Sequence, residues 1–463
     1  MFMISFLRNF PKLCRLLYII SKNQLLTHTG DLKLPISIKI MGWVNCLLLY
    51  PKGLIIPPRE TLGRRLTDCF YELGPIYIKF GQTLSTRPDL IGTEIAESLK
   101  LLQDKLPEFD SKIARDLIEK CFNKTINEIF DDFDDKPVAA ASIAQVHKAR
   151  LKSGEIVAVK ILRPDIATRY DNDIRFLEYC SSVISCISKK VQRLKTKEVI
   201  EVFRQSMKCE LNLRSEAAAA SRIYDNFIGD NTLRIPKIYW SFTADNIITL
   251  EWIEGVSIYD QDIIIKQGLD PVDIAAKIAT IFFNQAYRDG FFHADLHPGN
   301  ILVCPDGKVA LVDFGIIGIL PENDRLAIAE ILYAFLKRDY RLVAEVHCRI
   351  GYIPKDTNLE HFAQSCRAIA EPIIGCAIKD ISIGNLLSQL FKVTEEFGME
   401  TQPQLLLLQK TMVVVEGIGQ SLNKEINMWQ LAEPWIKKWA AKNLSPEAKL
   451  LRFVKKILVK ICE

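Results

Sequence analysis

Two short motifs near the middle of the chain constrain its fold more than any other feature. Residues 291–303 read FFHADLHPGNILV and residues 311–315 read LVDFG, with the turn PDGK between them. Such a turn between apolar runs predicts a β-hairpin, which would bring Asn300 close to Asp313. Phosphoryl transfer from ATP needs a set of this kind, in which Asp295 orients the nucleophile while an amide oxygen and a second carboxylate hold a divalent metal. We therefore predict a nucleotide site; two ordinary, unrelated loops are the alternative.

The composition describes a folded body without a bias toward nucleic acid. The 463 residues exceed one average domain, so two lobes with extensions are expected. Apolar residues make up 49% and charged residues 25%, and a net charge of +4 gives no argument for a nucleic-acid partner. The twelve cysteines are scattered singly without a Cys-x-x-Cys pair, which is typical of buried thiols in a reducing compartment and not of a zinc site.

No part of the sequence predicts a helix that spans a membrane. A span requires roughly 18 consecutive apolar residues, and no run reaches that length. The run 13–20 contains Arg15 and is followed by no cleavage site, and the run 40–50 contains Asn45. We therefore expect no secretory signal and a location on the cytosolic side of a membrane.

Apolar periodicity divides the chain into five predicted segments. An N-terminal segment near the membrane precedes a helical extension, a strand-rich lobe, a mostly helical lobe and a basic amphipathic tail. Their bounds are 1–60, 61–125, 126–253, 254–435 and 436–463. Strands first and helices later predict an α+β body of two lobes.

The strand-rich segment contains a lysine suited to phosphate binding. Residues 147–151 and 156–162 form a predicted hairpin that carries the run VAVK, with Lys160 at its end. Kinase-type sites use such a lysine to neutralise the α- and β-phosphates, although strands also often end in a solvated lysine. Further strand-like runs cover residues 233–240 and 247–252, and we predict Glu251 in the second run as a nucleotide-binding residue.

An alanine-rich stretch occupies the place of a glycine-rich phosphate loop. It lies directly before the hairpin of Lys160. Alanine permits close approach of the backbone but disfavours the positive φ that glycine allows. We therefore predict a stiffer loop with differently directed phosphate-binding amides. Its residues are Ala139, Ala140, Ala141 and Ser142.

A lysine in such a site needs a carboxylate partner, and two candidates follow in the chain. Glu210 and Glu216 lie six residues apart within one long helix predicted from about 199 to 227. On one helix they would point about 120° apart and could serve two different basic groups. We assign Glu216 to Lys160; a pair of solvated helix carboxylates is the alternative.

Polar side chains also interrupt an apolar helix pattern in the run IKFGQ. Lys79 and Gln82 share one helical face, and Gly81 beside them indicates close contact with another element. Taken alone, this pattern favours a helix packing interface with incidental polar residues.

Together these motifs resemble the UbiB family of atypical protein-kinase-like proteins, which is tied to ubiquinone biosynthesis. The resemblance covers roughly residues 60–425 and includes the run EGIGQSLN at 416–423. It implies a two-lobed protein-kinase-like fold with an N-terminal helical extension that carries a Lys-x-Gly-Gln motif. It also implies ATP and Mg²⁺ as cofactors.

The resemblance further implies a role for each matching residue. Lys79 and Gln82 would be regulatory residues of the extension, which folds over the active site, and Lys79 would pair with Glu210. The catalytic set would be Asp295, Lys160 and Glu216, and the metal ligands would be Asn300 and Asp313.

Several features depart from the family or from ordinary kinases. The family's second acidic residue after Glu210 is Asn212 here, and its usual proline is Leu296. Ala294 replaces the arginine of the ordinary kinase loop, and only five residues separate Gly315 from Pro321, where a helix should begin. No Ala-Pro-Glu sequence follows, so we expect no phosphorylation of other proteins.

We therefore predict a Mg-dependent atypical kinase or ATPase of the UbiB type that supports ubiquinone biosynthesis. Enzymes or lipid intermediates of that synthesis would be its partners. One alternative is a nucleotide-gated scaffold with little turnover. Another is a small-molecule phosphotransferase, because the run HADLH also resembles aminoglycoside phosphotransferases; that family, however, lacks the Lys-x-Gly-Gln extension.

The tail offers a second prediction about the membrane. From Leu450 onward one face is apolar, and five basic residues, counted from Lys449, accompany it. This pattern suits a helix that lies on anionic lipid, and a helix docked on the kinase body is the alternative. We therefore expect peripheral association with the inner membrane.

Overall fold

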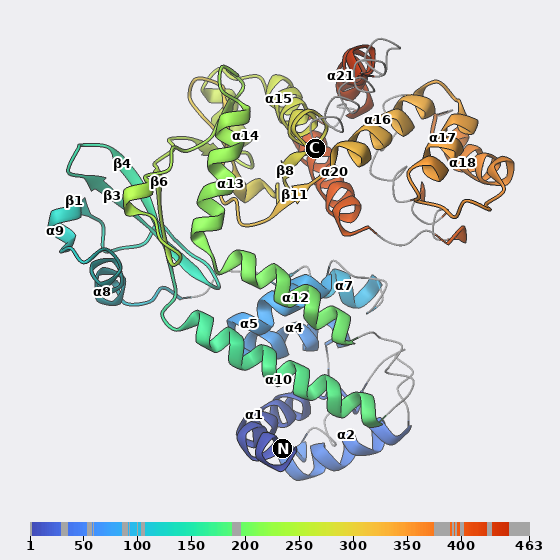
Figure 1. Cartoon of the computed structure of the whole chain (residues 1–463). Helices are drawn as coiled ribbons and strands as arrows, with labels where there is room; N and C mark the ends of the chain where they lie inside the picture. The colour runs from blue at the N-terminus through green and yellow to red at the C-terminus, as the bar shows by residue number, and fades with distance from the viewer. Residues whose placement is uncertain are drawn as a thin grey trace, which may run out of the picture. The chain divides into compact units, whose positions relative to one another are not determined.

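The computed structural model, drawn in Figure 1, divides into two compact units. Unit 1 comprises residues 1–214 and 239–250, and unit 2 comprises residues 215–238 and 251–463. The described residues are 2–28, 36–52, 58, 60–85, 91, 93–99, 101–102, 107–187, 196–374, 389–390, 393, 396–398, 402–423 and 428–443. Of the predicted basic tail at 436–463, residues 436–443 are described and belong to a helix, and the amphipathic pattern from Leu450 lies outside the described residues.

Unit 1 begins with helices, as the sequence predicts for residues 61–125. They are α1 (Phe2–Lys22), α2 (Ile36–Leu49), α4 (Leu62–Leu73), α5 (Pro75–Ser85), α7 (Thr93–Leu99), α8 (Ser111–Phe122) and α9 (Ile126–Ile129). Helix α4 begins where the Thr61 hydroxyl accepts a hydrogen bond from the backbone N–H of Arg64, a capping contact that satisfies one free amide. Phe70, Tyr77 and Ile78 then form an apolar core with Leu99.

Unit 1 also contains the main β-sheet, in the order β1-β3-β4-β6 with β2 beside β3. Its strands are β1 (Phe130–Phe133), β2 (Ala139–Ala140), β3 (Ala144–Leu151), β4 (Ile156–Leu162) and β6 (Ile247–Glu251). The predicted hairpin of Lys160 is confirmed, because β3 and β4 pair antiparallel. Helices α8 and α9 pack Ala114, Ile118 and Ile126 against the apolar side chains of this sheet.

The single long helix predicted from about 199 to 227 is wrong. After α10 (Ile166–Ile187), the chain forms two helices, α12 (Thr196–Glu210) and α13 (Leu213–Asn226). The backbone N–H of Leu213 donates to the Asp245 carbonyl at 2.9 Å and so leaves the helical ladder. Asn212 lies at the break, where a residue of its type competes with helical hydrogen bonds. Glu210 and Glu216 therefore lie on different helices and do not point in two directions from one helix, contrary to the prediction.

Unit 2 contains two small sheets and a second set of helices. The strand orders are β5-β10-β9-β7 and β11-β8. The strands are β5 (Leu233–Arg234), β7 (Val256–Ser257), β8 (Phe291–His293), β9 (Ile301–Val303), β10 (Val309–Leu311) and β11 (Ile317–Ile319). The run predicted as a strand from 233 to 240 is shorter, because Pro236 has no N–H to donate to a ladder.

Helices make up the rest of the regular structure of unit 2. They are α14 (Gln261–Lys266), α15 (Pro271–Phe283), the π-helix Asn284–Asp289, α16 (Glu322–Leu336), α17 (Tyr340–Arg349), α18 (Leu359–Ile374), α20 (Pro403–Leu422) and α21 (Met428–Asn443). Of these, α15 and α20 contact the strands of the unit. Helix α16 begins directly after Pro321, as predicted. Among the described helices, none is long and apolar enough to cross a membrane.

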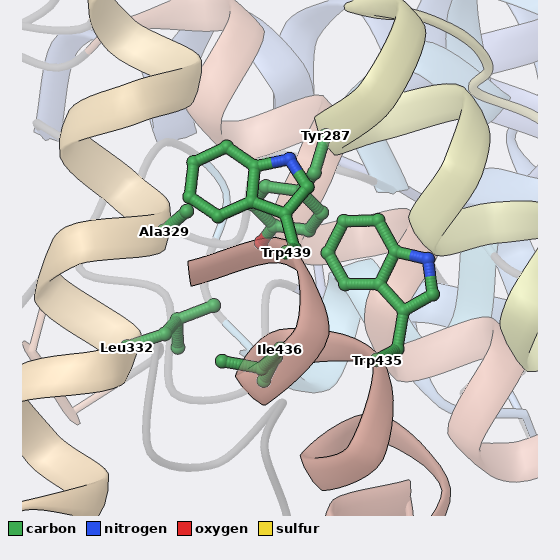
Figure 2. Close-up of a pocket in the computed structure, with 6 residues that line it drawn as sticks. All are labelled: Tyr287, Ala329, Leu332, Trp435, Ile436 and Trp439. Carbon is green, nitrogen blue, oxygen red and sulfur yellow. The ribbon is translucent and has the colours of Figure 1, made fainter. Parts of the chain in front are cut away.

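Helix α21 packs against α16 and the π-helix through aromatic rings. Figure 2 shows the six residues that line the small pocket there, Tyr287, Ala329, Leu332, Trp435, Ile436 and Trp439. The Trp435 and Trp439 rings stack with their centroids 6.2 Å apart. The Trp435 Nε1–H donates to Asn284 Oδ1 at 2.9 Å. The lining is apolar, so we assign this pocket to helix packing.

Candidate active site

The loop between β8 and β9 carries Asp295 and Asn300. It leaves β8 at His293, which lies opposite Ile317 of β11, and ends in the short 3₁₀ helix Pro298–Asn300. The Asn300 side-chain amide donates to the Asp295 backbone carbonyl at 3.0 Å. This bond fixes the Asn300 amide group across the loop and leaves its oxygen as the atom that can meet a metal.

The predicted hairpin places Asp313 beside this loop. Strands β9 and β10 pair antiparallel, and the backbone N–H of Val312 donates to the Asn300 carbonyl at 3.0 Å. Asp313 adopts a left-handed conformation with φ +62°, which an aspartate tolerates better than most residues. Its carboxylate accepts from the Gly315 backbone N–H at 3.3 Å. Asp295, Asn300 and Asp313 are thus joined within unit 2, as the sequence predicted.

His293 connects the two loops, a role that the motif alone did not reveal. Its side chain is fully buried, and its Nδ1 accepts from the Asp295 backbone N–H at 3.2 Å. Its Nε2 lies 3.3 Å from the Val312 carbonyl, which can only accept, so Nε2 carries the proton. Burial lowers the pKa of His293, which keeps the ring neutral in that tautomer.

Lys410 is a second residue that the sequence did not reveal. It lies on α20, and its Nζ is 3.3 Å from Asp295 Oδ1. Because both side chains are partly exposed, the pair adds at most about 1 kcal/mol to stability, and its effect on the direction of the carboxylate matters more. No signal in the sequence links the two residues, which are 115 positions apart.

In unit 1, the alanine-rich loop is held by Arg163. Ala139 and Ala140 form β2, and the Ala141 N–H donates to the Ala144 carbonyl at 2.8 Å. The guanidinium of Arg163 donates to the Ala141 carbonyl through Nε at 3.1 Å and Nη2 at 2.9 Å. Nη2 also donates to the Pro107 carbonyl at 2.8 Å, which ties the loop to the preceding segment.

The residues that follow this loop form a buried polar network. Gln145 accepts from the Phe109 backbone N–H at 3.1 Å and lies 2.8 Å from His147 Nε2. Burial lowers the pKa of His147, so the ring is neutral, and its Nδ1–H donates to the Asp134 carbonyl at 2.8 Å. The fully buried Ser142 hydroxyl makes no hydrogen bond to any described residue. These contacts support the prediction of a stiff loop.

Three further predicted residues lie on regular elements. Lys160 lies on β4 opposite Val146, and Glu216 is buried in the first turn of α13. Because these two belong to different units, their pairing stays a prediction. The Glu251 carboxylate accepts from Arg234 Nη2 at 2.5 Å and from the Lys237 backbone N–H at 3.2 Å, so its role in nucleotide binding also stays a prediction.

The expected ion pair joins Lys79 of the helical extension to Glu210 at the end of α12. Lys79 Nζ lies 3.2 Å from Glu210 Oε2, and these side chains are only 18% and 12% exposed. Gln82 donates to the Leu102 carbonyl at 3.1 Å. Gly81 lies so close to Phe70 and Leu102 that an added Cβ would be 2.6 Å and 2.4 Å from their side chains, as the predicted close contact requires. The regulatory role of these residues stays a prediction.

The oxygen atoms in unit 2 suit a hard cation. A carboxamide and a carboxylate are ligands that Mg²⁺ accepts when water and phosphate oxygens complete its octahedron. Among the described residues, no group of three or more His, Cys, Asp or Glu side chains forms a separate metal site. Asn300 and Asp313 therefore fit a metal that arrives with a nucleotide.

Comparison with known proteins identifies the class. The family model of an ABC1 atypical kinase-like domain matches residues 101–347, and that of a UbiB helical domain matches residues 366–427. A "Probable protein kinase UbiB" of Tolumonas auensis is 40% identical over 396 residues, 84% of this chain and 73% of that protein. Its namesake of Marinobacter nauticus is 39% identical over 439 residues, 94% of this chain and 79% of that protein. The chain belongs to the UbiB family of atypical kinase-like proteins.

A solved structure supports the same fold. The structure of the complex of Rv3197 with erythromycin from Mycobacterium tuberculosis has a TM-score of 0.50 and 23% identity, and the match covers 86% of this chain and 97% of that one. This likeness concerns the fold alone. With the matched kinase-like domain, it confirms the predicted kinase-like α+β fold with its N-terminal helical region.

Proposed function

We propose that this chain binds ATP with Mg²⁺ and transfers or hydrolyses the γ-phosphoryl group. The observation that carries the proposal is the placement of Asp295, Asn300 and Asp313 on two loops of unit 2, of which the first is held by the Asn300 side-chain amide and joined to the second by the Val312 backbone N–H. It brings a carboxylate that can orient the nucleophile close to two oxygen ligands that can hold the metal. Phosphoryl transfer requires both kinds of group.

Each residue of the set has a distinct task in this proposal. Asp295 orients a water molecule or hydroxyl group and accepts its proton as its oxygen bonds to the γ-phosphorus and the bond to ADP breaks. Asn300 and Asp313 hold Mg²⁺, which when bound neutralises charge on the phosphate oxygens. Neutral His293 holds the two loops together through its hydrogen bonds, and Lys410 orients the Asp295 carboxylate.

Residues of unit 1 serve the nucleotide in the same proposal. The backbone of 139–142 meets the phosphates, Lys160 neutralises them, and Glu216 positions that lysine. Lys79, Gln82 and Glu210 restrain turnover, a role supported by their closely packed, ion-paired helix surface. We expect no protein substrate, because Ala294 and the short segment from Gly315 to Pro321 leave no machinery for activation or peptide docking.

The wider role is support of ubiquinone biosynthesis at a membrane. Membership of the UbiB family supports this proposal. It includes peripheral association with the cytoplasmic side of the inner membrane, anionic lipid as a contact, and enzymes or lipid intermediates of that synthesis as partners. The tail from 446 to 463 stays a predicted lipid contact, and deletion of these residues with unchanged flotation on liposomes would exclude it.

Steady-state hydrolysis of ATP tests the proposal. We expect turnover with Mg²⁺ that disappears with EDTA, measured with and without vesicles that contain cardiolipin. If no condition gives hydrolysis and Asp313→Asn still abolishes function in cells, the nucleotide-gated scaffold replaces the enzyme.

A further inference from the structure

Helix α2 turns its large apolar side chains away from the protein. Leu48, Leu47 and Ile40 are 75%, 61% and 58% exposed. The other members of this outer face are Met41, Trp43 and Val44, all exposed. At 100° per residue these six positions fill an arc of about 160°, and none of them is polar.

The inner face of α2 holds small and polar residues instead. It packs on α1, its neighbour in Figure 1. Asn45 donates to the Leu17 carbonyl at 3.0 Å and to the Ser21 hydroxyl at 2.6 Å. Cys46 is fully buried, and an added Cβ on Gly42 would lie 2.5 Å from Leu26 Cβ.

This arrangement is the reverse of a helix that packs on a protein in water. Such a helix turns its apolar stripe to the core and its polar side chains to the solvent. Close approach at a glycine, interhelical hydrogen bonds from an amide, and apolar residues outside are typical of helices in an apolar medium. Contiguous apolar patches of this kind mark an interaction surface.

The surrounding charge indicates the chemistry of what covers this face. Residues 1–59 contain eight Lys or Arg and the single acidic residue Asp31, a net charge of +7, whereas the whole chain carries +4. Lys12 and Lys22 pair with Asp173 and Glu72 inside unit 1. Lys39 and Lys52, near the two ends of α2, are exposed and form no ion pair with a described residue.

Two amphipathic rings reinforce this pattern. Exposed Trp43 lies on the outer face of α2, and Tyr18 of α1 is exposed and contacts Tyr50 edge to face, with ring centroids 6.5 Å apart. Tryptophan and tyrosine prefer the boundary between headgroups and acyl chains, where the ring body is apolar and the tip meets water.

We propose that α2 docks this chain on an anionic lipid surface, lying in the plane of the membrane with its outer face among the acyl chains. Its 14 residues are too few to span a bilayer and suit an interfacial helix. A second copy fits less well, because the exposed lysines near the ends of two α2 helices repel each other, whereas each of these lysines is attracted to anionic headgroups. The inference rests on the proposed membrane association and assigns it to a site other than the tail.

Vesicle flotation of the full chain tests the assignment. The variant Leu47→Glu/Leu48→Glu should lower the partition coefficient on phosphatidylcholine–phosphatidylglycerol vesicles by at least about tenfold, because two apolar anchors become charged. Its matched control is Ile228→Glu/Ile265→Glu, which changes residues that are 74% and 57% exposed in unit 2 and should leave flotation unchanged. Pure phosphatidylcholine vesicles should bind the wild type less strongly.

A second readout does not depend on the charged variants. Brominated lipid should quench the tryptophan fluorescence of wild type more than that of Trp43→Phe, because Trp43 enters the membrane.

Each result that contradicts the proposal would refute a different part of it. Equal flotation of wild type and the Leu47→Glu/Leu48→Glu variant, or equal quenching in the Trp43 comparison, overturns the role of α2 and leaves membrane association intact. Absence of flotation for wild type overturns membrane association itself, while ATP hydrolysis remains separately measurable. A wild-type dimer in gel filtration that this variant disrupts without a change in flotation identifies a second copy as the occupant.

Discussion

The catalytic loops of unit 2 and the alanine-rich loop of unit 1 are held by opposite means. In unit 2, neutral His293 accepts from one loop and donates to the other, so this link places no positive charge between the two loops. In unit 1, the cationic Arg163 clamps the Ala141 carbonyl. The loops of Asp295 and Asp313 are thus linked through a neutral side chain, whereas the loop that we propose for the nucleotide phosphates is fixed by a positively charged one.

The largest effect should come from the metal ligand of unit 2. Asp313→Asn should weaken Mg-dependent ATP binding at least about a hundredfold, because the metal loses its charged ligand. Isothermal titration calorimetry measures this. Asp306→Asn, in the exposed turn of the same hairpin, is the matched control and should bind like wild type. Unchanged affinity in Asp313→Asn would refute the metal assignment.

His293 should affect turnover more than binding. His293→Phe removes both connecting hydrogen bonds, so we expect kcat to fall about tenfold to a hundredfold and the free energy of unfolding to fall by about 1–3 kcal/mol. Steady-state kinetics and chemical denaturation measure the two effects. His361→Phe, at an exposed position on α18, should change neither. A rise in KM at constant kcat would place the residue in nucleotide binding instead.

Arg163 should show the opposite pattern. Arg163→Met removes its bonds to the Ala141 carbonyl, so the loop loosens and KM for ATP should rise about tenfold with a smaller change in kcat. Arg150→Met, an exposed position on β3, is the matched control. If kcat falls while KM stays constant, the distinction drawn between the two loops is wrong.

The smallest effect should come from the extension. Lys79→Ala and Glu210→Gln should each raise ATP hydrolysis about threefold to fivefold, because each removes one side of the same restraining pair. The double variant should match either single variant, as coupled positions do in a double-mutant cycle. Additive increases, or a loss of activity in Lys79→Ala, would contradict a joint restraining role.

Short-range patterns predicted the hairpins that carry the candidate site residues. The turn at 305–308 and its flanking apolar runs specify the hairpin locally, so Asn300 and Asp313 had to meet. The strands around Lys160 follow from the same kind of local alternation. The Lys79–Glu210 pair was expected only through the family resemblance, because no local pattern joins residues so far apart.

Long-range packing decided what the sequence did not predict. The break at Asn212 depends on a hydrogen bond to Asp245, and the contact of Lys410 with Asp295 depends on how α20 packs. The outward apolar face of α2 was missed because periodicity shows that one face is apolar but not which face meets the protein.

The most direct test of the central claim separates ATP binding from turnover in one variant. Asp295→Asn keeps both metal ligands, so it should bind ATP and Mg²⁺ like wild type while hydrolysis falls below about one hundredth of the wild-type rate. Hydrolysis by Asp295→Asn at the wild-type rate would contradict the account, since the carboxylate would then have no part in the chemistry.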